Sequence, residues 1–123
     1  MLRIATEKQR HVIAYQDAKF TVEPLTKEEE KKLIDKHTLR VKKRPGPGQP
    51  QEFVEEIDFL ELAAAKFDRQ VVDWEGVDAE CTTENKRSIV FLAENAHIYD
   101  HLRQEIDTIG QSEEERLREE EKN

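Results

Sequence analysis

The stretch Val71-Val72-Asp73-Trp74-Glu75-Gly76-Val77, followed at residues 81–85 by Cys-Thr-Thr-Glu-Asn, divides the chain into its structural parts. The apolar run interrupts the helical spacing that precedes it, and Gly76 supplies backbone freedom. We therefore predict a buried hydrophobic turn that is anchored by Trp74. The Thr82-Thr83-Glu84-Asn85 sequence is typical of a helix N-terminus, so a new helix is expected to begin there.

Two further helices are expected after this turn, near residues 83–94 and 96–109. The second has an apolar stripe at helical spacing, formed by Ile98, Leu102, Ile106 and Ile109. Gly110 is a natural helix stop. Residues 111–123 contain six Glu, two Arg and one Lys, so we expect an acidic tail that is partly helical or disordered. Pairs such as Glu114–Arg118 would support helix there without building a core.

Upstream of the turn, the sequence predicts a helix over residues 53–69 and a linker before it. The helix is indicated by apolar residues that recur at i, i+4 and i+7, namely Phe53, Ile57, Leu60, Ala64 and Phe67. Residues 40–50, RVKKRPGPGQP, hold three of the four prolines and begin with a basic cluster at 40–44. Because proline disfavours regular helix and central strand, we expect an exposed, mobile basic loop.

The first 25 residues are predicted to form a small β-hairpin. Residues 11–15 and 19–23 are rich in β-branched and aromatic side chains, with a plausible turn at 16–18. A helix over 26–37 follows, with Thr26 as N-cap and Glu29 completing a capping box. The fold class is therefore mainly α with a small N-terminal β-hairpin (α+β), in one domain spanning residues 1–110. Its core is expected to place Trp74 against Phe67, Leu92, Ile98 and Leu102.

Composition narrows the function classes. The chain has 123 residues, 36% hydrophobic and 39% charged, with a net charge of −8. An acidic excess argues against the phosphate neutralisation on which nucleic-acid binding depends. No apolar run approaches the ~20 residues of a membrane helix, and no signal peptide is recognisable, so we expect a cytoplasmic protein. A thin core beside so much charge favours self-association.

No candidate catalytic or metal site has a complete set of residues. His97 and His101 lie one helical turn apart, but residue 98 is Ile where a zinc protease needs Glu, and no third ligand is identifiable. Cys81 is the only cysteine, which excludes an intramolecular disulfide, and a half-buried thiol is favoured over a nucleophile. The acidic residues around Trp74 lack the glycine of a calcium loop. We expect a protein that is not an enzyme and binds no cofactor, metal or small-molecule substrate.

The order of these features resembles the tail assembly chaperones of long-tailed bacteriophages and prophages. Such chains often carry a V-x-W-x-G-V segment, a spacer, a T-x-E-N helix start and a last helix of similar length. Here these are residues 72–77, the spacer to Cys81, residues 82–85 and the helix with Tyr99 near its beginning. The opening strand and helix cap at residues 20–26 are also similar. The resemblance covers roughly residues 10–110.

The resemblance implies a protein made in the host bacterial cytoplasm that coats the tape measure protein, keeps it soluble, associates with other copies and promotes assembly of the tail tube. An apolar groove formed by the last two helices and the Trp74 turn is expected to bind an amphipathic helix of that partner. The expected partner-binding residues are Trp74, Phe91, Leu92, Ile98, Tyr99, Leu102 and Ile106. The basic residues 40–44 are read as a solvated linker, or as a contact for the acidic surface of a protein partner or of another copy.

Two other readings stay open. One is a structural minor tail or tail-completion protein, which would be found in purified virions. The other is a small bacterial regulatory or antitoxin-like binding protein, which would be encoded beside a toxin rather than beside tail genes.

Overall fold

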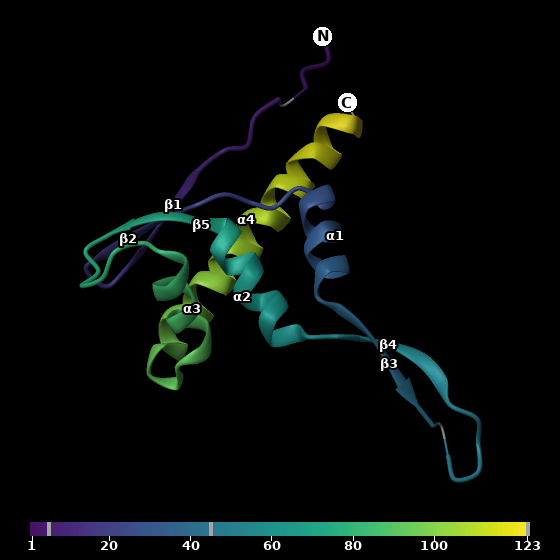
Figure 1. The fold of residues 1–123 in the computed structure, drawn as a ribbon. Helices are drawn as coiled ribbons and strands as arrows, with labels where there is room; N and C mark the ends of the chain where they lie inside the picture. The colour runs from purple at the N-terminus through teal and green to yellow at the C-terminus, as the bar shows by residue number, and fades with distance from the viewer. Residues whose placement is uncertain (5, 45, 123) are drawn as a thin grey trace.

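The computed structural model describes residues 1–4, 6–44 and 46–122, with side chains up to Ser112. Within this part of the chain the fold is α+β, with four α-helices and two antiparallel sheets (Figure 1). The elements in order are β1 (His11–Tyr15), β2 (Ala18–Val22), α1 (Lys27–Lys36), β3 (Thr38–Lys43), β4 (Glu52–Ile57), α2 (Phe59–Gln70), β5 (Val71–Glu75), α3 (Thr83–Phe91), the 3-10 helix η1 (Ala93–Asn95) and α4 (Ala96–Lys122).

The first sheet has the strand order β1-β2-β5, with β2 in the centre. The predicted N-terminal hairpin is confirmed, and Ile13 lies opposite Phe20 in its register. The prediction of a turn at residues 71–77 is wrong for residues 71–75, which form β5 and pair with β2 so that Trp74 lies opposite Phe20. The physical reason is that an isolated hairpin is marginal in water, and β5 supplies the third strand.

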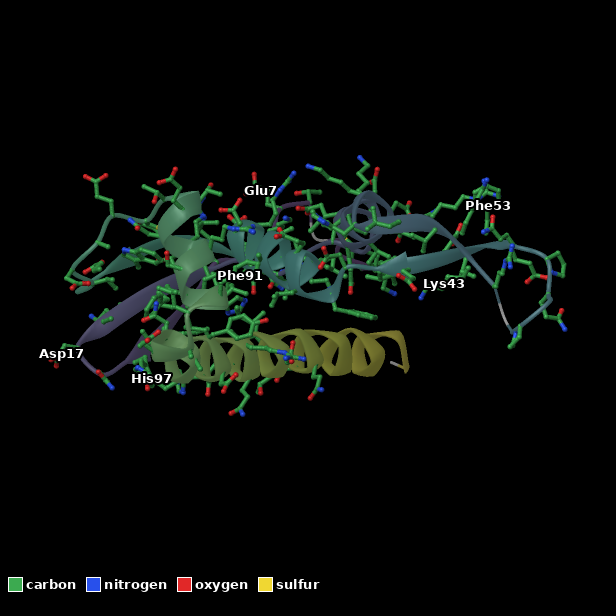
Figure 2. All side chains as sticks on the ribbon, turned by 60° about the horizontal axis from the view of Figure 1, so that its bottom comes forward. Glu7, Asp17, Lys43, Phe53, Phe91 and His97 are labelled. Carbon is green, nitrogen blue, oxygen red and sulfur yellow. The ribbon has the colours of Figure 1, made fainter. Side chains whose placement is uncertain are left out.

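The core lies between this sheet and the helices, with α4 running along the molecule beneath the other elements (Figure 2). Its buried members are Ile13, Phe20, Val22, Phe67, Val71, Trp74, Ile89, Leu102 and Ile106. The predicted burial of Trp74 is confirmed, and its ring meets Phe20 edge-on at 6.0 Å between centroids. The prediction that Leu92 packs in this core is wrong. Leu92 is the C-cap of α3, where the chain changes direction, and it is 52% exposed.

A second hairpin, β3–β4, projects from the body between α1 and α2 (Figure 1). It corrects two predictions, because residues 40–43 are strand and residues 52–57 are strand rather than the start of a helix. Of the loop expected over residues 40–50, only residue 44 and residues 46–50 lie outside a strand in the described part of the chain. The helix begins only at Phe59, because Asp58 caps it by accepting a hydrogen bond from the Glu61 amide at 3.2 Å.

The helix starts at α1 and α3 are confirmed, and the predicted end of the last helix is wrong. Thr26 and Glu29 form the complete capping box of α1, and Thr82 accepts from the Asn85 amide as N-cap of α3. Helix α4 continues through Gly110 to Lys122. One glycine costs a helix only about 1 kcal/mol, which good helix formers on both sides can offset. The expected Glu114–Arg118 pair lies outside the described side chains.

None of the helices in the described part of the chain is both long and apolar enough to cross a membrane.

Candidate functional site

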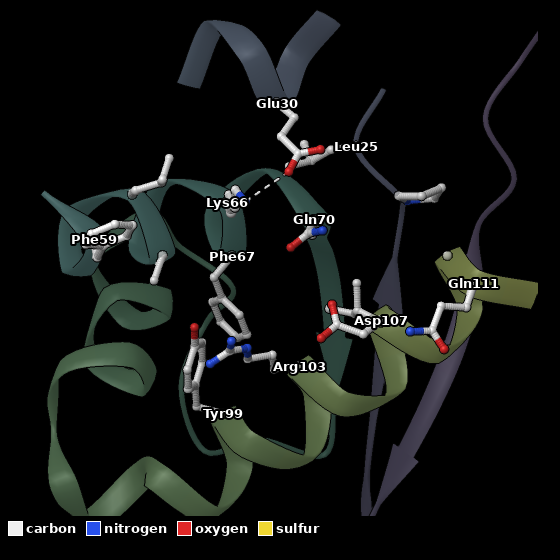
Figure 3. Close-up of a pocket in the computed structure, with 15 residues that line it drawn as sticks. Leu25, Glu30, Phe59, Lys66, Phe67, Gln70, Tyr99, Arg103, Asp107 and Gln111 are labelled. Carbon is white, nitrogen blue, oxygen red and sulfur yellow. Dashed lines mark hydrogen bonds and ion pairs between the residues drawn. The ribbon is translucent and has the colours of Figure 1, made fainter. Parts of the chain in front are cut away.

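A groove runs between α2 and α4 on one side of the body, next to the segment that leads into α1 (Figure 3). Its volume is about 630 Å³. We call it the α2–α4 groove. It is lined by Pro24, Leu25, Glu30, Phe59, Leu62, Ala63, Lys66, Phe67, Gln70, Tyr99, Arg103, Ile106, Asp107, Gly110 and Gln111.

The floor of the groove is apolar and fixed by the core. Leu62, Phe67 and Ile106 are each less than 9% exposed, so their side chains are held by packing. The Tyr99 ring meets Phe67 edge-on at 5.7 Å between centroids, a favourable aromatic arrangement. A rigid apolar floor of this kind can receive apolar side chains from a partner without first reorganising.

The rim is polar and carries both signs of charge. Lys66 of α2 pairs with Glu30 of α1 at 3.2 Å, and this pair closes one side of the groove (Figure 3). Arg103 and Asp107 lie on the α4 side. A binding partner would therefore meet apolar contacts along the floor and charges at the edges, which suits an amphipathic helix.

Helical periodicity explains why these residues share one groove. The lining residues of α2 are Phe59, Leu62, Ala63, Lys66, Phe67 and Gln70, and those of α4 are Tyr99, Arg103, Ile106, Asp107, Gly110 and Gln111. Both sets repeat at intervals of three and four, so each forms one stripe of its helix. The small residues Ala63 and Gly110 keep the two walls low.

One mouth of the groove is open and strongly apolar. Phe59 is 73% exposed at the first position of α2, although it is among the largest apolar side chains of the protein. The neighbouring Leu60 is 54% exposed but does not line the groove. An aromatic ring left in water at the edge of an apolar floor is a feature of binding surfaces.

The structure does not bring the seven expected partner-binding residues together on one surface. Tyr99 and Ile106 line the α2–α4 groove, whereas Trp74 and Ile98 line a second cavity, which lies between the β1–β2 turn, the end of β5 and α3. Leu102 lines neither of them and is fully buried. On α3, Phe91 packs under the Arg87 guanidinium at 4.2 Å, and Leu92 is exposed.

Sequence reasoning missed the α2 wall of the groove. The apolar stripe was counted from Phe53, which belongs to β4, so it passed through Leu60 and Ala64 instead of Phe59 and Ala63. Asp58 was the residue that indicated the correct start, since an Asp before an apolar run is a common N-cap. Counting from that cap yields the observed stripe.

At the histidine pair and at Cys81, the described residues show no feature that would support metal binding or catalysis. His97 and His101 both contact Tyr15, the first through a 2.7 Å hydrogen bond and the second by ring contact at 4.6 Å. Among the described residues, no group of three or more metal-ligating side chains is found. Burial raises the pKa of the Cys81 thiol, which disfavours the thiolate needed for nucleophilic attack.

No protein-family model matches the chain, and searches of curated proteins and of solved structures found no match either. The resemblance to phage tail assembly chaperones therefore stays a prediction from the sequence motifs.

Proposed function

We propose that this protein is a phage tail assembly chaperone that binds an amphipathic helix of the tape measure protein in the α2–α4 groove. It would act in the cytoplasm of the host bacterium, without catalysis and without a cofactor. The single observation that supports this most is the groove itself, whose apolar floor and mixed-charge rim match the two faces of such a helix.

The proposal changes the expected binding surface. Leu102 and Trp74 are buried in the core, so they stabilise the fold rather than contact the partner. The residues that would touch the partner are the exposed or half-buried ones, Phe59, Ala63 and Tyr99. Long apolar helices without a partner aggregate, and covering their apolar face keeps them soluble.

The test is co-expression with the tape measure protein of the same genome, reading the soluble fraction of that partner. The Phe59→Glu variant is expected to abolish the rescue, because it places a charge at the apolar mouth. The substitution is compatible with folding, since Phe59 is exposed and acidic residues are favourable in the first turn of a helix.

The matched control is Leu60→Glu, which adds the same charge one residue away and outside the groove lining. It should leave the rescue intact. A tape measure protein that is no more soluble with the wild-type chain would contradict the proposal, and so would equal loss in both variants. Finding the chain in purified virions would favour a structural tail component instead.

A further inference from the structure

The molecule carries opposite charges at its two ends. At one end is the basic arm, defined as β3, β4 and the loop between them. The arm contains four basic side chains, all within residues 40–44, and three acidic ones, all on β4, so its positive charge is concentrated on β3 and Arg44. At the other end is the acidic end, defined by Asp17, Glu75, Asp78 and Glu80. Figure 2 shows Asp17 at one extremity, and Lys43 and Phe53 at the opposite one.

The basic arm has exposed apolar surface as well as charge. Arg40 and Lys42 lie over the Phe53 ring, at 4.5 and 5.2 Å from its centroid. On the other face, Leu39 and Val54 are 56% and 39% exposed. Since two-stranded hairpins are marginal in water on their own, an arm with exposed apolar residues on both faces indicates an interaction surface.

The two signs of charge in the arm lie on different strands. Strand β4 holds the three acidic residues of the hairpin, and Glu56 forms an ion pair with Lys43 of β3. The chain as a whole is acidic, so the extended phosphate backbone of a nucleic acid would be repelled by the rest of the molecule. The arrangement therefore favours a protein partner with localised carboxylates over a nucleic acid.

The acidic end offers such a surface around a hollow. Residues 73–80 contain four acidic side chains and no basic one. A cavity of about 400 Å³ opens there, rimmed by Asp17 and Asp78, with the half-buried Ala18 and Val77 among its apolar lining. Among the residues that the structure describes, none forms an ion pair with Asp17, Asp78 or Glu80.

We propose that copies of this chain associate head to tail, with the basic arm of one copy docked on the acidic end of the next. The two surfaces are complementary in charge and both offer apolar contacts. Because they lie at opposite ends of the molecule, they cannot satisfy each other within one chain. A contact between two different surfaces produces rings or open chains of subunits rather than a closed dimer. This inference is independent of the proposed function.

Sedimentation velocity over a concentration series tests the inference. The wild-type protein should show an average mass that rises past the dimer with concentration. The association should weaken by roughly tenfold or more between low and high salt, since opposite surface charges are screened. A monomer at all concentrations, or a dimer that does not grow, would overturn the proposal.

Charge reversal identifies the surfaces. The arm variant is Lys42→Glu with Arg44→Glu, which spares the Lys43–Glu56 pair, and the end variant is Asp17→Lys with Asp78→Lys. Each alone should reduce association about tenfold or more, because like charges then face each other. Mixed in equal amounts, the two variants should associate again, since the reversed arm of one matches the reversed end of the other.

The matched control is Lys27→Glu with Lys31→Glu on α1, which changes net charge as the arm variant does but leaves both surfaces intact. It should associate like wild type. Variants that keep wild-type circular dichroism yet fail to recover in the mixture would overturn the proposal. So would arm-dependent binding of duplex DNA, which assigns the arm to nucleic acid.

The two proposals can fail separately. The arm variant should still rescue the tape measure protein in co-expression, whereas Phe59→Glu should still self-associate.

Discussion

Gly76 follows β5 with a φ of +73°, a left-handed conformation that favours glycine. A Cβ at this position would lie 2.5 Å from the Asp17 carbonyl oxygen in the β1–β2 turn. Both the conformation and the contact therefore oppose any side chain. We predict that Gly76→Ala lowers the free energy of unfolding by about 2–3 kcal/mol, measured by urea denaturation.

Gly48 provides the matched control for Gly76. Its φ of +79° is nearly the same, but a Cβ there would meet no atom within 4 Å. Gly48→Ala should therefore cost only the conformational part, about 1 kcal/mol. Equal losses in the two variants would show that the close approach to Asp17 contributes nothing.

Lys86 is a buried residue of α3, and its ammonium group contacts the C-terminal end of α2. It donates hydrogen bonds to the carbonyl oxygens of Asp68 at 2.9 Å and Val71 at 3.0 Å. The Asp68 Oδ1 atom lies 3.1 Å from the ammonium but accepts no hydrogen bond of acceptable geometry, so this third contact is an ion pair alone.

We predict that Lys86→Met destabilises the fold by about 2–3 kcal/mol, because it leaves buried carbonyl oxygens without a donor. The readout is the midpoint of thermal unfolding. Lys31→Met, at an exposed position of α1, should leave this midpoint unchanged. A Lys86→Met protein as stable as wild type would mean that water satisfies the two carbonyl groups.

Residues differ in how far their structural roles can be predicted from sequence. Thr26 was predicted as a cap, and residues 82–85 as a helix start, because the partners in both cases lie three residues away. The role of Lys86 was not predictable, since its partners lie 15 and 18 residues away and are brought close by the packing of α2 on α3. Local rules identify local contacts, and a buried lysine depends on tertiary structure.

At the scale of elements, the contact between α2 and α3 includes one exposed ion pair. Arg87 donates to both carboxylate oxygens of Glu61, at 2.8 and 2.5 Å. These hydrogen bonds lower the pKa of Glu61 from its ordinary value of 4.5. A lowered pKa in the folded state means that the contribution to stability is present above 4.5 and is lost as the pH falls below it.

We predict that Glu61→Gln reduces the acid sensitivity of the fold. The wild-type melting temperature should fall as the pH drops from about 6 to about 3, and this fall should be smaller in the variant. Glu80→Gln, at an exposed position with no ion pair among the described residues, is the control and should retain the wild-type dependence. Identical pH profiles for all three proteins would refute the role of the α2–α3 pair.

Strand predictions failed where tertiary pairing decided the conformation. Residues 52–57 have apolar side chains both four apart and adjacent, so their sequence is compatible with helix and with strand. Their pairing with β3, in which Arg40 lies opposite Glu55 and Val41 opposite Val54, selects the strand. Likewise, residues 71–75 became a strand because β2 offered a free edge.

At the scale of the whole molecule, the candidate site combines predictable and unpredictable parts. The α4 wall, with Tyr99 and Ile106, follows from a stripe that the sequence displays clearly. Predicting the α2 wall required the correct start of that helix. Predicting that the two walls face each other required the tertiary packing of α4 on the rest of the fold. The fold class was therefore predicted in part, with the helices and first hairpin recognised and the second hairpin missed.

The core joins parts of the chain that are distant in sequence, and the basic arm lies outside it. Strands β2 and β5 pair across about fifty residues, and α1 contacts α2, so the body is continuous on both sides of the arm. In contrast, β3 and β4 pair mainly with each other, and residues 47–51 of the loop between them are exposed. Proteolytic cleavage within the arm should therefore leave the core folded.

We predict that, among the sites within residues 11–109, trypsin first cleaves after Lys42 or Lys43, before any cut between residues 59 and 109. The two fragments should remain together in gel filtration and keep the wild-type far-UV circular dichroism, because the β2–β5 pairing and the helix packing hold them. Separation of the fragments by urea should occur only at the concentration that unfolds the core. First cleavage inside α2 or α3, or fragments that separate in buffer, would show that the arm contributes to the stability of the body.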